Sequence, residues 1–264
     1  FDPACGSGNF LIIAYKELRR LEMKILRESG QIALSNISLD QFYGIEIDDF
    51  SHEISILSLW LAKHQMSIEF FENFGKRKPT LPLKSSGNIV KGNACRLEWN
   101  KICPKQKDDE TYVLGNPPYV GARNQNSEQK EDMKNIFNND YSSLDYVTAW
   151  MFSGANYISN SKIKLAFVAT SSVCQGEQVS MIWPRLLKYN IEIYFAFTSF
   201  GWKNSAKDNA GVSVIIIGIR NINSEDKFIH LENGHSKHVK NINGYISEGP
   251  NIFISKKSKP LSFL

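Results

Sequence analysis

The sequence lacks the features that mark membrane, secreted and metal-binding proteins. No apolar run approaches the roughly 18–20 residues that a membrane span needs, and nothing at the start reads as a signal peptide. Only four cysteines occur among the 264 residues, with no Cys-x-x-Cys pair and no histidine partner at zinc spacing. We therefore expect a reduced cytoplasmic protein that holds no metal.

The common phosphate-binding patterns are also missing. The sequence has no Gly-Lys-Ser/Thr ending to a phosphate loop, which disfavours a nucleoside triphosphate. It has no Gly-x-Gly-x-x-Gly, which weakens the case for a dinucleotide. The formal net charge of +4 and the pI near 8.7 are compatible with a polyanionic partner but do not by themselves indicate one.

What the sequence does contain is an alternation of turns, helices and short apolar strands. Apolar residues recur at helical spacing over 10–26 (Leu11, Tyr15, Leu18, Leu21, Ile25), 53–66 (Ile54, Leu57, Trp60, Leu61), 145–158 and 179–188. Apolar strand runs occupy 42–47, 89–90, 112–114, 165–169, 191–197 and 212–219. This alternation predicts an α/β fold with a doubly wound, mainly parallel, seven-stranded sheet. The polar residues 121–141 predict a surface loop or a lid.

Composition also suggests a domain organisation. Residues 1–222 read as one catalytic core, and past about residue 222 the composition turns to Asn, Lys, Gly and His. We interpret 223–264 as the connection toward a second domain that is mostly absent. Phe1-Asp2-Pro3 reads as the end of a strand, so we expect the chain to be part of a longer protein.

A Gly-rich turn directly follows that first strand. In Asp2-Pro3-Ala4-Cys5-Gly6-Ser7-Gly8-Asn9-Phe10, the glycines allow a tight turn close to a ligand, and the next helix offers free N–H groups at its start. A plain strand-to-helix turn is the simple alternative. A second acid, Glu46, follows the next strand, where doubly wound folds place a carboxylate on ribose hydroxyls. The two acids together favour a site for a nucleoside-containing cofactor.

Asn116-Pro117-Pro118-Tyr119 is the strongest signal in the chain. It stands at the carboxyl end of an apolar strand, where ligands bind in open α/β sheets. Neither proline offers an N–H, so the Asn116 side-chain oxygen and the Pro117 carbonyl form an acceptor site suited to an –NH2 group. Tyr119 supplies a flat face for a planar base. The alternative is a rigid proline turn with a capping asparagine.

These motifs resemble the gamma-class DNA amino-methyltransferases, in which the cofactor motif precedes the catalytic one. More narrowly, the chain resembles the methyltransferase core of the single-chain type IIL (Mme-type) restriction–modification enzymes. The segments that carry this resemblance are 41–47, 59–66, 92–94, 175–179 and 214–218. The resemblance implies a class I, Rossmann-like fold and methyl transfer from S-adenosyl-L-methionine to adenine N6 in double-stranded DNA. The preference for adenine comes from the asparagine that begins the catalytic tetrapeptide.

The resemblance also implies residue roles in cofactor binding. Asp2, with the backbone of Ala4, Cys5, Gly6, Ser7 and Gly8 and the motif's Phe10, would hold the methionine part and sugar edge of the cofactor. Glu46 would take the ribose hydroxyls, and Ile47 would lie against the adenine ring. Asn93, followed by Ala94, stands where these enzymes usually carry an aspartate that binds the adenine amine of the cofactor.

For the target base, Asn116, Pro117, Pro118 and Tyr119 would be catalytic. Phe200 would stack on the flipped adenine beside Tyr119, with Trp202 as the alternative. The further cofactor segment and the target-recognition domain of these enzymes are not found, so we expect the chain alone to bind cofactor weakly and to methylate slowly or not at all. Two other functions stay open: a protein glutamine-amide methyltransferase, which shares the catalytic tetrapeptide, and an inactive DNA-binding scaffold.

Overall fold

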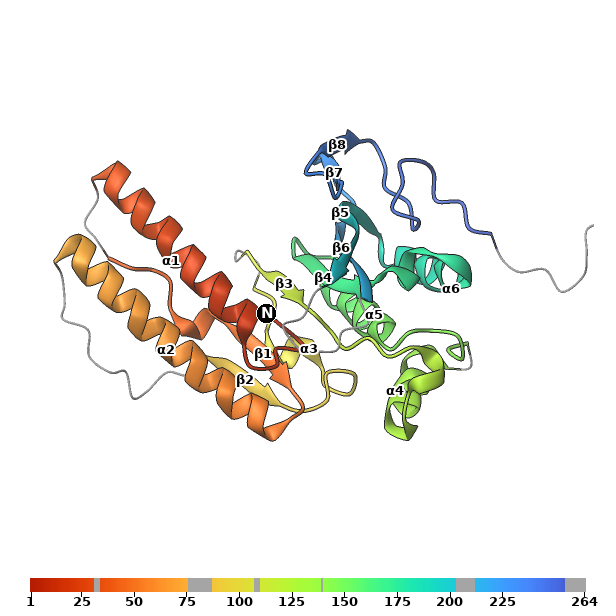
Figure 1. Cartoon of the computed structure of the whole chain (residues 1–264), viewed down its shortest axis with the longest axis horizontal. Helices are drawn as coiled ribbons and strands as arrows, with labels where there is room; N and C mark the ends of the chain where they lie inside the picture. Colours follow the sequence, from red (N-terminus) through yellow and green to blue (C-terminus); the bar gives the residue numbers. More distant parts are fainter. Residues whose placement is uncertain (31–33, 76–86, 107–109, 139, 203–211, 255–264) are drawn as a thin grey trace, which may run out of the picture. The chain divides into compact units, whose positions relative to one another are not determined.

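The computed structural model describes residues 1–30, 34–75, 87–106, 110–138, 140–202 and 212–254 (Figure 1). The chain divides into two compact units, Phe1–Asp109 and Glu110–Leu264. The first carries the predicted cofactor residues and the second carries the predicted catalytic residues. Each unit is described separately.

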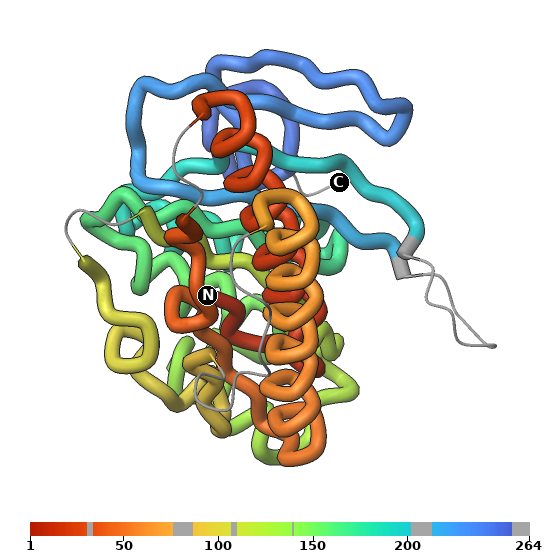
Figure 2. The backbone as a smooth tube through the Cα atoms, turned by 90° about the vertical axis from the view of Figure 1, so that its left-hand side faces the viewer, coloured from red at the N-terminus to blue at the C-terminus, as the bar shows by residue number. Residues whose placement is uncertain are grey.

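The first unit consists of a small parallel sheet and two long helices. Its elements are α1 (Asn9–Ser29), η1 (Leu39–Gln41), β1 (Tyr43–Glu46), α2 (Asp49–Phe74), β2 (Asn88–Lys91) and α3 (Trp99–Ile102). Strands β1 and β2 pair in parallel, and Asp2 adds an isolated parallel bridge to Gly44. The predicted opening strand is therefore a single bridge at the edge of this pair. Helices α1 and α2 lie side by side (Figures 1 and 2).

Local signals set the ends of these helices. Helix α1 starts after Gly8, whose φ of 84° is left-handed, and ends at Gly30, with φ of 62°. The Asp48 side chain accepts a hydrogen bond from the Ser51 amide at 2.8 Å and so caps the first turn of α2. Gly75 ends that helix in the left-handed conformation.

The buried faces of both helices differ from the predicted ones. Helix α1 buries Leu11 and Tyr15 as expected, but Leu18, Leu21 and Ile25 are 45–53% exposed. The helix has apolar residues on more than one face, so spacing alone did not identify the one that packs inward. The residues that it buries are Leu11, Tyr15, Arg19, Met23 and Leu26. Arg19 is tolerated there because its guanidinium pairs with Glu22 at 2.9 Å.

Helix α2 also buries residues other than the predicted ones, and two of them are small. Leu57 and Leu61 are 47% and 50% exposed, whereas the buried positions are Ser55, Leu59, Ala62 and Met66. A Cβ on Gly8 would lie 3.3 Å from the Ser55 Cβ, so α2 approaches the Gly-rich turn closely at this point. A large side chain at position 55 would not fit there. The Ser55 hydroxyl is satisfied by donating to the His52 carbonyl at 2.7 Å.

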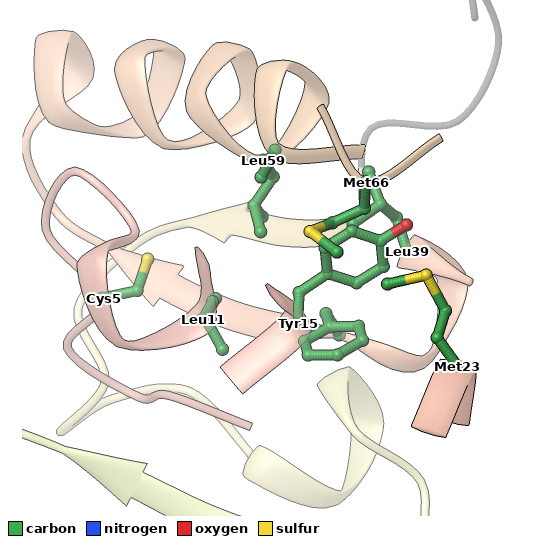
Figure 3. Close-up of a cluster of buried hydrophobic side chains, with 9 residues drawn as sticks. Cys5, Leu11, Tyr15, Met23, Leu39, Leu59 and Met66 are labelled. Atoms are coloured by element: carbon green, nitrogen blue, oxygen red, sulfur yellow. The ribbon is translucent and has the colours of Figure 1, made fainter. Parts of the chain in front are cut away.

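The core of the first unit lies between the helices and the strand pair. Figure 3 shows Tyr15 and Met23 from α1 meeting Leu59 and Met66 from α2, with Leu39 beside them. The Tyr15 ring packs edge-on against Phe42, with the ring centroids 5.4 Å apart. This core holds β1, and with it Glu46, beside the turn that follows Asp2.

The second unit contains a mixed six-stranded sheet in the order β3-β4-β6-β5-β7-β8. Its strands are β3 (Tyr112–Gly115), β4 (Lys164–Thr170), β5 (Ile191–Trp202), β6 (Val212–Asn221), β7 (Lys227–His230) and β8 (Ser236–Val239). Only β3–β4 and β5–β7 are parallel pairs. The α/β class is confirmed, but the prediction of one mainly parallel, seven-stranded sheet is wrong for the described residues. Only residues 203–211 separate β5 from β6, too few for the crossover that a parallel pair needs.

The helices of this unit are α4 (Ser127–Phe137), α5 (Val147–Ile158) and α6 (Gly176–Leu186), with short 3-10 turns η2 (Ala122–Asn124), η3 (Ser171–Cys174) and η4 (Leu187–Tyr189). Helix α4 corrects the predicted loop or lid over 121–141. It is capped by Asn126 and Gln129, and it buries Asp132, Met133 and Phe137. Few apolar residues were enough because Asp132 is buried as the acceptor of the Tyr146 hydroxyl at 2.8 Å.

The described ranges contain neither a candidate membrane span nor a candidate metal site. No helix there is long and apolar enough to cross a membrane. No group of three or more His, Cys, Asp and Glu side chains there is placed to hold a metal ion. All four cysteines are free thiols.

Candidate active site

Backbone hydrogen bonds tie the Gly-rich turn to the end of β1. The Cys5 amide donates to the Ile45 carbonyl at 3.0 Å, and the Gly8 amide donates to Cys5 at 2.8 Å. Gly6 and Gly8 have φ values of 54° and 84°, which side-chain-bearing residues rarely adopt. The turn therefore depends on both glycines that the sequence singled out.

Glu46 lies at the carboxyl end of β1 and closes onto this turn. Its Oε2 accepts from the Gly6 amide at 2.8 Å, and its Oε1 accepts from the Asp48 amide at 2.9 Å. Each carboxylate oxygen has a second lone pair, so the group can also accept from ligand hydroxyls. Ile47 follows it with 60% of its surface exposed, as a residue against a ligand ring would be before binding.

Asp2 is fully buried at the start of the turn. Its Oδ1 accepts from the Ala4 amide at 3.0 Å, while its Oδ2 is buried with no hydrogen-bond partner among the described residues. Burial raises the pKa of Asp2 to about 7, and the nearby charge of Glu46 adds to the increase. A buried carboxyl oxygen with no partner fits a cationic ligand or one that donates a hydrogen bond.

Cys5 packs behind the turn as a neutral group. It is 5% exposed, and burial raises the pKa of its thiol to about 12. A Cβ on Gly44 would lie 3.0 Å from the Cys5 Sγ, so the strand and the turn touch at this point. A thiol that stays protonated at neutral pH is not a nucleophile.

Asn93 and Ala94 follow β2, the parallel neighbour of β1. Glu46 and Lys91 are register partners, and the Gly92 amide donates to the Glu46 carbonyl at 2.8 Å. The Asn93 Oδ1 accepts from the Cys95 amide at 2.9 Å, and the Ala94 carbonyl accepts from the Trp99 indole at 2.9 Å. The structure thus brings Asp2, Glu46 and Asn93 to one edge of the first unit.

We expect Glu46→Ala to weaken cofactor binding by one to two orders of magnitude. The change removes the acceptor of the Gly6 and Asp48 amides together with the proposed ribose contact, and each charged hydrogen bond contributes roughly 1.5–3 kcal/mol. Calorimetric titration with S-adenosyl-L-methionine measures the change. Glu53→Ala, which replaces an exposed glutamate on α2, is the matched control. Equal affinities for the wild type and Glu46→Ala would exclude this residue from the cofactor site.

In the second unit, Asn116–Tyr119 follows β3 directly. Burial raises the pKa of the Tyr119 hydroxyl, and the negative charge of Asp145 adds to this effect, while the neighbouring Asn116 side chain acts against it. The Asn116 Oδ1 is buried with no hydrogen-bond partner among the described residues. A buried amide oxygen of this kind is suited to a ligand that donates an N–H.

Val120, the residue after Tyr119, is held through its backbone. Its amide donates to the Asp145 Oδ1 at 3.0 Å, and its carbonyl accepts from the Gln125 Nε2 at 3.1 Å and from the Tyr146 amide at 3.0 Å. Neither Asp145 nor Gln125 was predicted from the sequence to belong to the site. Asp145 could have been found because it is the only charged residue in the mainly apolar run 144–151.

Phe200 lies on β5 at the same end of the sheet. It pairs with Val214 on β6, and Val214 pairs with Thr170 at the end of β4. Strand β4 is the parallel neighbour of β3, which leads into Asn116. The register therefore places Phe200 in line with the edge from which the catalytic tetrapeptide continues. The side chain of Trp202, the alternative, lies outside the described residues.

Comparison with known proteins identifies the family. Residues 1–230 match the model of the family described as MmeI, DNA-methyltransferase domain. The chain belongs to this family. The predicted resemblance to the type IIL enzymes is thereby confirmed.

Individual relatives support the assignment. The chain is 47% identical over its whole length to DNA methyltransferase A of Bacillus subtilis and covers 31% of that protein. The solved structure of the type IIL restriction-modification enzyme MmeI in complex with DNA superposes with a TM-score of 0.91 at 41% identity, over 100% of this chain and 37% of that one. The type IIG restriction endonuclease BpuSI shares the fold, with a TM-score of 0.57 at 14% identity over 87% of this chain and 23% of that one. The chain thus spans about a third of the length of DNA methyltransferase A and MmeI.

Proposed function

We propose that this chain is the catalytic part of a site-specific DNA methyltransferase that modifies adenine N6 within a restriction–modification system. The observation that carries the proposal is the Asn116 Oδ1 directly after β3, which is buried and has no hydrogen-bond partner in the described part of the chain. An exocyclic –NH2 is the donor that this acceptor lacks. Membership in the MmeI methyltransferase family supports DNA as the substrate.

The cofactor proposed for the first unit is S-adenosyl-L-methionine, which supplies a methyl group on a positively charged sulfur. The residues present fit such a ligand. The buried Asp2 Oδ2 has no hydrogen-bond partner among the described residues, and the cofactor is cationic. Glu46 would supply carboxylate oxygens for the ribose, and the Ala4–Gly8 backbone, with its two left-handed glycines, would hold the ligand at the turn.

The target adenine must leave the duplex, because its N6 amine cannot be reached inside the stack. Tyr119 and Phe200 would offset part of the unstacking cost by stacking on the extruded base. The protein partner in this step is double-stranded DNA. Residues 223–264 would connect toward the part that reads its sequence, an assignment that stays a prediction.

Asn116 and Pro117 would then prepare the amine for attack. The N6 lone pair is delocalised into the ring, and acceptor bonds from the Asn116 Oδ1 and the Pro117 carbonyl draw the two hydrogens out of the ring plane. The lone pair would become localised on N6, ready for the methyl group that S-adenosyl-L-methionine would supply from its positively charged sulfur. N6 would lose one of its protons to solvent after the transfer. The main contributions are orientation and charge complementarity, and no base is needed before attack.

The test is a methylation assay read at the level of the modified base. This chain, and a version extended to the length of its relatives, are incubated with S-adenosyl-L-methionine and unmethylated DNA, and the nucleosides are identified by mass spectrometry. We expect N6-methyladenine with the extended chain. If cofactor binds but no methylated base forms with either protein, the DNA substrate is wrong and glutamine amides are tested next. If N4-methylcytosine forms instead, the assignment of adenine is wrong.

A further inference from the structure

The buried carboxylate of Asp145 links the loop that follows Asn116–Tyr119 to two other elements of the second unit. Its Oδ1 accepts from the Val120 amide at 3.0 Å and from the Val147 amide of α5 at 3.2 Å. Its Oδ2 accepts from the Thr170 hydroxyl, at the end of β4, at 3.3 Å. The side chain is thus hydrogen-bonded to the loop after β3, the first turn of α5 and the end of β4. Only 6% of the residue is exposed.

Gln125 bonds the carbonyl group of Val120, whose amide donates to Asp145. Its Nε2 donates to the carbonyls of Val120, at 3.1 Å, and Leu144, at 2.9 Å. The Asp145 amide in turn donates to the Gln178 Oε1 at 3.2 Å, which attaches this group to α6. Both backbone groups of Val120 are therefore bonded to buried partners.

The position of Val120 explains why this hold matters. Pro117 and Pro118 have no N–H groups, so between Asn116 and Tyr119 the loop has few donors with which to fix its own course. It is anchored upstream by β3, whose last residue Gly115 is in register with Phe167. Val120 is the downstream anchor. Misplacement of a reacting group by about 1 Å costs on the order of 100-fold in rate, so the two anchors set the reactivity of the loop between them.

We propose that Asp145, acting with Gln125 through Val120, is a positioning residue for the Asn116–Tyr119 loop, and that its role is that of a hydrogen-bond acceptor rather than of a negative charge. This inference rests on the proposed function of that loop. A simpler role is possible on geometry alone, because Asp145 also caps α5 through Val147. The variants below separate the two roles.

If Asp145 acts as a hydrogen-bond acceptor, two substitutions at this position should differ in their effect on the transfer rate. Asp145→Ala removes both oxygens and releases the Val120 amide. Asp145→Asn keeps an Oδ1 for Val120 and Val147, and its Nδ2 can donate to the Thr170 hydroxyl, which accepts as well as donates. We expect Asp145→Ala to slow single-turnover methyl transfer by about 100-fold. Asp145→Asn should transfer at close to the wild-type rate, and both variants should bind cofactor normally.

Gln125→Met tests the contribution of the hydrogen bond to the Val120 carbonyl, and Asn221→Leu is its control. The change removes the amide that bridges the Val120 and Leu144 carbonyls, and transfer should slow while cofactor affinity stays constant. Asn221→Leu removes a side-chain amide of the same kind, which donates to the Ile158 and Ser161 carbonyls at 2.6 and 2.8 Å, away from the loop. Thermal unfolding is measured for both, so that each rate refers to folded protein. Asn221→Leu should transfer at the wild-type rate.

Amide hydrogen exchange supplies a readout that needs no activity. Among residues 117–120 only Tyr119 and Val120 carry an exchangeable amide, because the other two are prolines. We expect exchange of the Val120 amide to be slow in the wild type and in Asp145→Asn, and fast in Asp145→Ala.

The outcomes distinguish this proposal from the one on which it rests. If Asp145→Asn loses as much transfer as Asp145→Ala, the charge matters and the acceptor role is wrong. If Asn221→Leu slows transfer as much as Gln125→Met, the effect is general destabilisation. If Asp145→Ala leaves both the rate and the exchange of Val120 unchanged, the positioning role is excluded. If the wild type transfers no methyl group to DNA, the proposed function fails, and the exchange measurement still decides whether Asp145 holds the loop.

Discussion

Asn116→Ala is expected to lower the rate of methyl transfer by about a thousandfold and to leave the affinity for S-adenosyl-L-methionine unchanged. The change removes the acceptor proposed for the adenine amine. Because this Oδ1 is buried without a hydrogen-bond partner among the described residues, its removal should cost the chain little thermal stability. Activity and stability should therefore separate cleanly.

The measurement is single-turnover transfer of a labelled methyl group, with cofactor affinity followed by calorimetry and stability by thermal unfolding. Asn124→Ala is the matched control, because this asparagine is exposed at the end of η2, eight residues further along. It should behave as the wild type. Substantial transfer by Asn116→Ala would remove Asn116 from the catalytic role. A parallel loss of cofactor binding would assign it to the binding step instead.

Asp2→Asn is expected to change the pH dependence of stability and to weaken cofactor binding. The folded-state pKa of Asp2 is about 7, against 3.8 for the ordinary side chain, because the carboxyl group is buried. Between these values the folded chain binds a proton that the unfolded chain has lost, so the contribution of Asp2 to stability falls as the pH rises. From pH 5 to pH 8 this loss amounts to about 3 kcal/mol. The asparagine variant does not titrate and should not show it.

The measurement is urea unfolding of the wild type and of Asp2→Asn at pH 5 and pH 8. Titrating groups that do not interact with Asp2 cancel in the comparison, and the variant should gain stability relative to the wild type as the pH rises. Asp40→Asn, at an exposed aspartate in η1, is the control and should show no such gain. The same relative stability of Asp2→Asn at both pH values would contradict the raised pKa. Unchanged cofactor affinity in this variant would exclude Asp2 from the cofactor site.

The parts of the site that were predictable from the sequence are those encoded by neighbouring residues. The left-handed turn at Gly6 and Gly8, and an acid after β1, follow from residue types and their order alone. The same is true of Asn116 directly after β3, because a short apolar strand followed by two prolines has few conformations open to it. The structure places Glu46 at the carboxyl end of β1 and Asn116 directly after β3, whereas the turn follows only the single bridge of Asp2.

Other features were missed because they depend on what packs against them. Leu18 and Leu57 looked like core residues, but both are exposed, and α1 and α2 bury other positions, among them the small residues Ser55 and Ala62 of α2. Helix α4 was taken for a loop because its buried Asp132 counts as polar in any hydropathy pattern. Its partner, the Tyr146 hydroxyl, lies 14 residues away in the sequence.

The sequence by itself determined the α/β class, the Gly-rich turn after Asp2, the place of Asn116–Tyr119 after a strand, and the family to which the chain belongs. The tertiary structure alone decided the sheet order and the residues that bond the backbone of Val120. Val120 and Asp145 are 25 residues apart, and Asp145 and Gln178 are 33 apart. The reason is physical: a turn or a cap is set by the conformations of a few adjacent residues. A buried hydrogen bond between distant segments forms only after the elements that carry them have packed and excluded water.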